Sequence, residues 1–164
     1  MNTKVKRIIF AILIIINCIV IFNFSSQNSE KSNETSGMIV EKVVNIISTI
    51  SPKVEKETIK EQVSFWVRKL AHFSIYTLLG IFLMNEANTF KMTKKRKIII
   101  CMLFGALYAI SDEFHQGFVG GRSPKIMDVC IDTCGVIFGI ILVIIAGKLI
   151  SKIKEPKKLP AVSE

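Results

Sequence analysis

The sequence predicts an all-α integral membrane protein, a bundle of four transmembrane helices with an amphipathic helical outer loop. Two observations carry this prediction. Half of the 164 residues are hydrophobic and the mean hydropathy is +0.46, which is too apolar for an ordinary soluble domain. The apolar residues also gather into four runs, and a spanning helix needs about 20 residues. We expect spans at about 8–24, 66–84, 96–115 and 126–147, within one membrane domain of residues 1–150.

The first run follows the basic leader MNTKVKR, as the apolar segment of a signal peptide would. A cleavage site requires small residues after the run, and Phe22, Asn23 and Phe24 stand there instead. We therefore expect this run to be an uncleaved membrane anchor.

The outer loop of residues 25–65 has a helical pattern of its own. Ile39, Val43, Ile46, Ile47 and Ile50 recur at helical spacing opposite polar residues, which predicts an amphipathic helix. A second, more charged helix is expected to start at the Ser-Pro pair of residues 51–52 and to reach the membrane interface at the tryptophan of position 66. Two roles stay open for this pair of helices: a lid on the outer leaflet over the bundle, or a shield for the loop within the interface.

The distribution of charge predicts a multi-pass protein of the cell membrane with both termini in the cytoplasm. In that orientation the inner segments hold 13 of the 22 basic residues, and the outer segments hold ten of the 13 acidic residues. An excess of Lys and Arg in cytoplasmic loops is the usual arrangement. The net charge of +9 is then explained by anionic lipid heads, so we expect membrane lipids as partners and no nucleic acid. Residues 151–164 form a polar cytosolic tail.

Polar residues form a stripe at the outer end of each of the last three spans. Side chains three or four residues apart lie on one face of a helix, and the polar residues of each span follow that spacing. The stripes consist of Arg68, His72 and Tyr76 on the second span, Tyr108, Ser111, Asp112 and His115 on the third, and Asp128 and Asp132 on the fourth. Gly135 and Gly139 continue the last stripe as G-x-x-x-G, a spacing that lets a neighbouring backbone come close. We expect the three stripes to face one another.

Asp132 gives the energetic reason for this arrangement. It lies about 13 Å into the fourth helix at the usual helical rise. An aspartate near the bilayer centre costs roughly 2.5 to 3.5 kcal/mol, so it must face the interior and find a donor. Arg68, His72 and Arg122 are the available partners. The alternative to a functional site is an ion-pair network that only holds the helices together.

The chemistry of these residues leaves several kinds of site open. Arg122 follows two glycines just before a helix N-terminus, an arrangement that suits an anionic group such as a lipid phosphate. Nitrogen and oxygen ligands for a divalent metal are present, but without H-E-x-x-H or comparable spacing, so we expect no metal and no cofactor. The carboxylates and His115 could serve as general acid and base, but no motif indicates a nucleophile. The catalytic residues, and whether the protein is an enzyme, are not predicted.

Three motifs resemble those of the VanZ-like family of small bacterial membrane proteins. They are FSSQ at residues 24–27 with serines following at 32 and 36, RKLAHFSIYTLLG at 68–80, and SDEFHQGFVGGRS at 111–123 with its trailing D-V-x-x-D-T-x-G. The family also has asparagine at the position of Asp132. The resemblance implies characteristic positions at Lys69, His72, Tyr76, Asp112, Glu113, His115, Gln116, Arg122, Asp128 and Gly135.

The resemblance implies reduced sensitivity to glycopeptide antibiotics of the teicoplanin type, and it leaves three functions open. The leading expectation is a non-enzymatic envelope protein that alters access to a lipid-linked cell-wall precursor or to the glycopeptide. The second is a membrane enzyme acting on a phosphorylated polyprenyl lipid or cell-wall precursor, with the carboxylates as acid, base or metal ligands. The third is a small transporter or flippase, which four helices could form only as an oligomer. The oligomeric state itself is not predicted.

Overall fold

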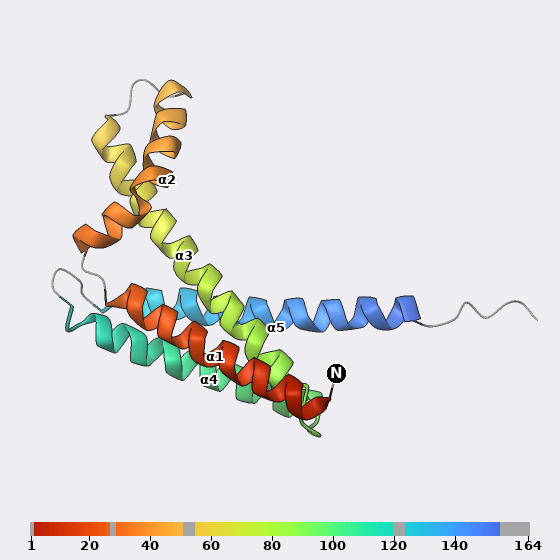
Figure 1. The fold of residues 1–164 in the computed structure, drawn as a ribbon. Coiled ribbons are helices and arrows are strands. Elements are labelled where there is room, and N and C mark those ends of the chain that lie inside the picture. The colour runs from red at the N-terminus through yellow and green to blue at the C-terminus, as the bar shows by residue number, and fades with distance from the viewer. Residues whose placement is uncertain (1, 27–28, 51–54, 120–123, 155–164) are drawn as a thin grey trace, which may run out of the picture.

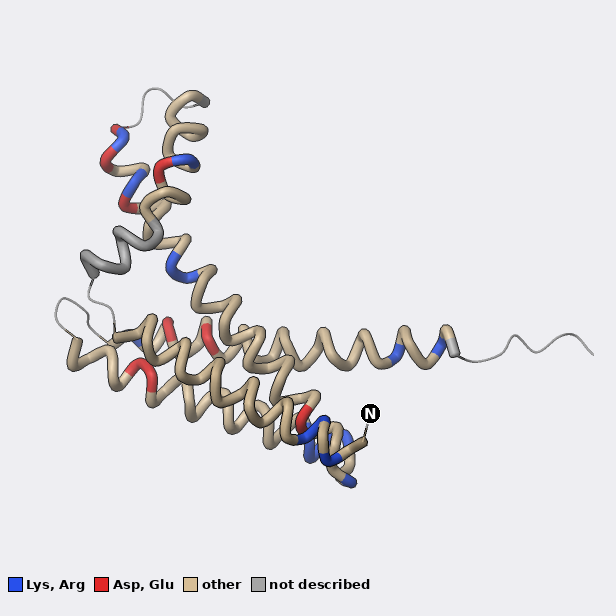
Figure 2. Tube along the Cα trace, viewed as in Figure 1, with Lys and Arg blue, Asp and Glu red and all other residues tan. Residues whose placement is uncertain are grey.

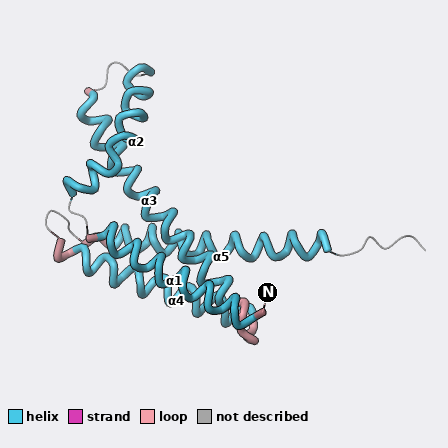
Figure 3. Tube along the Cα trace, viewed as in Figure 1, coloured by secondary structure: helices cyan, strands magenta, loops and turns pink. Residues whose placement is uncertain are grey.

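The computed structural model describes residues 2–26, 29–50, 55–119 and 124–154, with the side chains of residues 29–36, 50 and 154 left aside. The described residues form helices and no strands (Figure 1 and Figure 3), which confirms the all-α prediction. The elements are α1 (Thr3–Ser25), α2 (Ser29–Ile50), α3 (Lys56–Ala87), α4 (Lys94–Gln116) and α5 (Ile126–Lys154). Of these, α1, α3, α4 and α5 are long and apolar enough to cross a membrane, which confirms the prediction of four candidate spans.

The bundle is built around the contact between α3 and α5, with α1 and α4 packed side by side against them (Figure 1). Its core includes Tyr76 and Leu79 of α3, Ala109 of α4 and Val136 of α5, all of them fully buried. Large apolar side chains on the outside of the helices are exposed, as a surface facing lipid requires.

Glycines allow the backbones of α3 and α5 to touch. A Cβ atom at Gly80 would lie 2.2 Å from the carbonyl oxygen of Val136, and one at Gly139 would lie 2.2 Å from that of Thr77. At Gly135 the added atom would lie 2.6 Å from the carbonyl oxygen of residue 73. These approaches confirm the prediction that the G-x-x-x-G spacing brings a neighbouring backbone close.

Helix α3 differs from the prediction, because the second loop helix and the second span are one continuous helix. No glycine or proline lies between its first residue, Lys56, and Gly80, so nothing in the sequence interrupts the backbone hydrogen bonds. The rise in hydropathy near Trp66 marks the approach to the membrane and not a helix end. The helix starts after the N-cap residue Glu55, and the start expected at residues 51–52 lies outside the described residues.

Helix α2 packs on the first turns of α3. The pair has its own small core of Val40 and Val44 from α2 with Ile59 and Val63 from α3. Of the apolar face predicted for α2, Val43 and Ile47 pack against this core, whereas Ile39 and Ile46 are exposed. In Figure 1 the described part of this helical pair extends away from the bundle and does not lie across it.

Charge is segregated along the bundle (Figure 2). Lysine and arginine gather where α1 begins, where α3 passes into α4, and toward the end of α5, and we name this the basic end. The carboxylates of α4 and α5, which are Asp112, Glu113, Asp128 and Asp132, lie toward the opposite end. We name that the acidic end. It is formed by the end of α1, the middle of α3, the end of α4 and the start of α5.

Candidate functional site

The acidic end contains a cluster of one residue from each polar stripe. A ligand atom of His72 on α3, one of Asp112 on α4 and one of Asp132 on α5 all lie within 4.8 Å of one another. Both aspartates are buried, with 4% and 1% of their surface exposed, whereas the His72 side chain is 22% exposed. The three stripes therefore face one another, and we call these three residues the central cluster.

Asp132 lies beside His72, with Nδ1 of the histidine 3.6 Å from Oδ2 of the aspartate. That distance exceeds a hydrogen bond, and neither carboxylate oxygen of Asp132 has a hydrogen-bond partner in the described part of the chain. Of the donors expected for Asp132, Arg68 is half-buried and makes no ion pair with the described residues. Arg122 lies outside the described residues.

Asp112 is held by hydrogen bonds on one of its two oxygens. Ser25, at the end of α1, donates through Oγ to Oδ2 of Asp112 at 2.7 Å. Gln116 donates through Nε2 to the same oxygen at 3.2 Å and to Oγ of Ser25 at 3.3 Å. The other oxygen, Oδ1, is buried and without a hydrogen-bond partner among the described residues. The carboxylate is therefore fixed on one side and unsatisfied on the other.

Tyr76 lies one helical turn after His72 on α3, in the buried core of the bundle. Its side chain is completely buried, and its hydroxyl group has no hydrogen-bond partner in the ranges described. Its ring centroid lies 6.3 Å from that of Tyr108. The hydroxyl of Tyr108 in turn donates to the carbonyl oxygen of Cys18 at 2.7 Å, which ties α4 to α1.

Lys69 and Asp128 form an ion pair at the rim of the cluster, between α3 and the first turn of α5. Their side chains are 15% and 21% exposed. The ammonium group of Lys69 also lies 5.1 Å from the ring centroid of Phe65. This pair neutralises one carboxylate of the acidic end.

Glu113 lies behind this rim and helps to position the start of α5. Its Oε1 accepts a hydrogen bond of 2.6 Å from the backbone N–H of Lys125, immediately before the helix begins. Backbone N–H groups at a helix start have no intrahelical acceptor, so a side-chain acceptor stabilises them. Its Oε2 is buried with no hydrogen-bond partner in the described residues.

His115 belongs to a different contact. Its ring stacks on Phe22 of α1 with the centroids 4.4 Å apart, and its Nε2 lies 3.1 Å from Oγ of Ser26. Ser111, which shares the expected stripe, is exposed and donates back to the carbonyl oxygen of Tyr108 at 2.8 Å. The structure therefore does not bring His115 or Ser111 to the central cluster.

Helix α1 supplies polar residues that the stripe analysis missed. Asn17 and Ser25 are buried on the same face of α1, eight residues apart, with Ile21 between them. Ser25 is within the FSSQ motif, but its spacing to the aspartates gives no indication of the contact. Asn17 is a single amide in a run of isoleucines. A polar residue isolated in an apolar span indicates a side chain that faces the interior of the bundle, and Asn17 could have been found from that.

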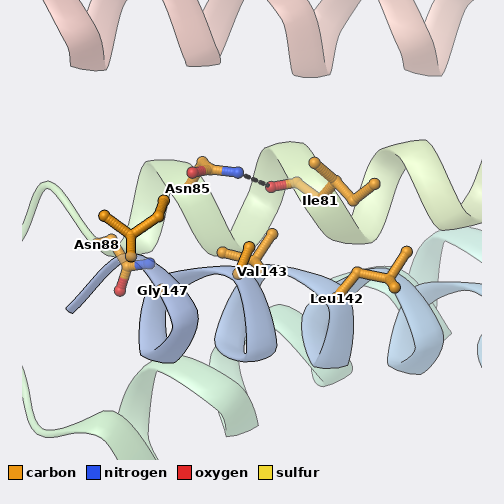
Figure 4. Close-up of a pocket in the computed structure, with 8 residues that line it drawn as sticks. Ile81, Asn85, Asn88, Leu142, Val143 and Gly147 are labelled. Carbon is orange, nitrogen blue, oxygen red and sulfur yellow. Dashed lines mark hydrogen bonds between the residues drawn. The ribbon is translucent and has the colours of Figure 1, made fainter. Parts of the chain in front are cut away.

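The hollow drawn in Figure 4 lies away from the acidic end. It measures about 400 Å³ between α3 and α5 and is lined by Ile81, Asn85, Leu142 and Gly147 among others. The amide of Asn85 is satisfied within its own helix, where Nδ2 donates to the carbonyl oxygen of Ile81 at 2.8 Å. No residue of the central cluster lines this hollow.

The acidic end thus contains three buried carboxylates, those of Asp112, Glu113 and Asp132, that form no ion pair with a lysine or arginine among the described residues. Four carboxylates lie there, and among the described residues only Lys69 forms an ion pair with one of them through a permanently charged group. Buried carboxylates without a counter-charge are strongly unfavourable in a low-dielectric interior. Such a site is suited to take up a cation or protons, or to act as acid and base on a polar group that enters it.

The comparisons with known proteins agree with the motifs. A family model described as VanZ/LLP1 matches residues 10–147, which contain the central cluster, its rim and most of the four spans. Comparison with curated proteins and with solved structures gave no match. Because the family model covers most of the chain and the structure has four candidate spans, the protein is a multi-pass membrane protein that belongs to the VanZ/LLP1 family.

Proposed function

We propose that this protein acts in the bacterial cell envelope, where its acidic end faces outward and lowers sensitivity to glycopeptide antibiotics of the teicoplanin type. The observation that carries the proposal is the cluster of His72, Asp112 and Asp132, which is buried between three spans at the end opposite the basic residues. Ionisable groups within a membrane are costly and are kept chiefly for function.

The charges of the two ends support the outward orientation. The basic end combines Lys4, Lys6 and Arg7 with the lysine-rich segment 94–97. Lysine and arginine accumulate on the cytoplasmic side of membrane proteins and are attracted to its anionic lipids. Both chain termini then lie in the cytoplasm, and the polar cluster opens toward the cell wall.

The partner that best fits this site is a lipid-linked cell-wall precursor. Arg68 is half-buried without an ion pair in the described part of the chain, and it lies one helical turn from His72 on α3. An arginine in that position can hold a phosphate of a lipid head, and the polar cluster behind it can hold the remaining polar groups. If the protein binds or reorients the precursor, the glycopeptide has less access to it.

The test is the teicoplanin sensitivity of cells that lack the chain, compared with cells that express it. Expression of the wild type should raise the minimal inhibitory concentration several-fold, and Arg68→Gln should lose most of that increase. Lys148→Gln, a change of an exposed lysine at the basic end, is the matched control and should retain it. Equal sensitivity with and without the wild-type chain would refute the proposal.

A second candidate, a membrane enzyme acting on a phosphorylated polyprenyl lipid, is favoured by the unsatisfied oxygens of Asp112 and Asp132 beside His72. These groups could serve as acid and base on a phosphate ester. Incubating the purified protein with a polyprenyl phosphate or diphosphate and following products by mass spectrometry tests this. An enzyme should lose essentially all turnover in Asp112→Asn, whereas a binding protein should show no product and only a graded loss of affinity.

A further inference from the structure

The central cluster has the ligand set of a metal centre. We propose that His72, Asp112 and Asp132 together bind one divalent transition-metal cation, Mn²⁺ or Zn²⁺. This inference goes beyond the proposed function, because it concerns only what the purified protein binds. It does not depend on whether the protein affects sensitivity to glycopeptides.

The first support is the distance between the three ligand atoms. All lie within 4.8 Å of one another, although they come from three different helices. Three such atoms always have a point between them that lies within about 2.8 Å of all three, and metal–ligand bonds in proteins are about 2.0–2.6 Å. Small side-chain rotations are therefore sufficient to reach coordinating distance, with no movement of the helices.

The second support is a set of buried polar atoms that lack partners at this point. Both oxygens of Asp132, Oδ1 of Asp112 and the hydroxyl oxygen of Tyr76 have no hydrogen-bond partner among the described residues. Asp132 is 1% exposed, Asp112 4% and Tyr76 not at all. Water does not satisfy such atoms freely inside a bilayer. A cation placed between the carboxylates would satisfy their oxygens directly.

The orientation of Asp112 provides the third support. Ser25 and Gln116 both donate to Oδ2, which leaves Oδ1 free for a ligand bond. Hydrogen bonds of this kind commonly orient the carboxylate and imidazole ligands of metal sites. The carboxylate is thus held by its neighbours in α1 and α4 and presents its other oxygen to the site.

The charge and the chemistry of the ligands identify the class of cation. Two carboxylates carry the charge that one divalent ion neutralises, and burial makes that neutralisation strongly favourable. Mg²⁺ and Ca²⁺ prefer oxygen ligands alone, whereas an imidazole nitrogen with two carboxylates suits a transition metal. His72 is partly exposed beside the Lys69–Asp128 pair, and this gives the ion a route to the cluster.

The sequence contains no metal-binding motif for these ligands because they are distributed over α3, α4 and α5. Metal motifs such as H-E-x-x-H place two ligands on one helix at a fixed spacing. Here each helix supplies one ligand, and only the close packing of α3 on α5 brings two of them together.

The test uses the full-length protein purified in lipid nanodiscs, freed of metal with a chelator and titrated with MnCl₂ while free Mn²⁺ is followed by electron paramagnetic resonance. The wild type should bind one equivalent per chain, and ZnCl₂ should displace it. His72→Ala and Asp112→Asn should each weaken binding by more than about tenfold, since even the groups that orient metal ligands are worth 10–100-fold. Asp132→Asn should also weaken it, since it removes the charge of the second carboxylate ligand.

Glu86→Gln is the matched control. Glu86 is a partly buried carboxylate with an unsatisfied Oε2, but it lies at the basic end of α3, so its replacement should leave Mn²⁺ binding unchanged. A melting experiment covers variants that fold poorly: Mn²⁺ should raise the melting temperature of the wild type and of Glu86→Gln but not that of His72→Ala. Failure of the wild type to bind one saturable equivalent would overturn the proposal, as would equal binding by His72→Ala and Asp112→Asn.

Discussion

Nδ1 of His72 lies 3.6 Å from Oδ2 of Asp132, across the contact between α3 and α5. The two side chains reach each other because the backbones of the two helices touch just beyond them. Gly135 lies three residues after Asp132. A Cβ atom added there would lie 2.6 Å from the carbonyl oxygen of Phe73, the neighbour of His72. The polar cluster thus depends on a helix contact that tolerates no side chain at the glycines.

Replacing Gly139 by alanine should destabilise the bundle by about 1–3 kcal/mol, because the added Cβ would lie 2.2 Å from the carbonyl oxygen of Thr77 and force α3 and α5 apart. Gly147→Ala on the same helix is the control, since nothing lies within 4 Å of its added Cβ, and it should not be destabilised. Thermal unfolding of the purified variants measures both. Identical melting temperatures would contradict the packing described for α3 and α5.

Ser25→Ala should cost about 1.5–3 kcal/mol, because it removes a buried hydrogen bond to a charged group, Oδ2 of Asp112. Ser111→Ala, at the same end of the bundle, removes only an exposed hydroxyl that bonds within its own helix, and its effect should be within about 0.5 kcal/mol. The comparison is made by chemical or thermal unfolding. A Ser25→Ala protein as stable as Ser111→Ala would show that α1 does not hold Asp112.

Lys69 and Asp128 should be energetically coupled. In a double-mutant cycle of Lys69→Met and Asp128→Asn, the double variant should lose about 1–2 kcal/mol less than the sum of the single variants, a modest value because both side chains are partly exposed. Unfolding free energies of the four proteins supply the coupling energy. Strictly additive losses would mean that the pair contributes nothing to the rim of the cluster.

The four candidate spans could be predicted from the sequence because a helix that crosses the bilayer must be apolar over about 20 residues, with its charged residues at the ends. The continuity of α3 could not, because the hydropathy rises near Trp66 while the helix continues unbroken from Lys56. Helical spacing likewise showed which residues share a face of one helix. It predicted that His72, Asp112 and Asp132 lie at one end, and the structure brings them together.

Spacing within one helix does not determine how neighbouring helices are rotated against each other. For that reason His115 was grouped with Asp112, although its ring lies against Phe22 of α1. The contact of Ser25 with Asp112 was missed for the same reason, since it joins residues 87 positions apart. The apolar face predicted for α2 included Val43 and Ile47, which pack beside Ile59 and Val63, but it did not include Val40 and Val44, which are buried in that core.

Cysteine labelling on intact cells tests the orientation of the bundle. In a background in which the four native cysteines are replaced, a cysteine at the exposed position of Glu57 should react with a membrane-impermeant thiol reagent. A cysteine at the exposed position of Lys95, at the basic end, should react only after the membrane is permeabilised. The opposite labelling pattern would place the acidic end in the cytoplasm and remove the basis for contact with cell-wall precursors.

The central claim is that the polar cluster is a functional site and not a scaffold, and Asp112→Asn tests it most directly. Asparagine keeps an oxygen that can accept from Ser25 and Gln116, so the hydrogen bonds that hold α1 to α4 survive while the charge is lost. Teicoplanin sensitivity is measured beside the amount and melting temperature of folded protein in the membrane. If the cluster is a functional site, the variant should be present in wild-type amounts and melt within a few degrees of the wild type, and its cells should be as sensitive as those lacking the chain. Full protection by the variant, or a protein that no longer folds, would contradict the claim.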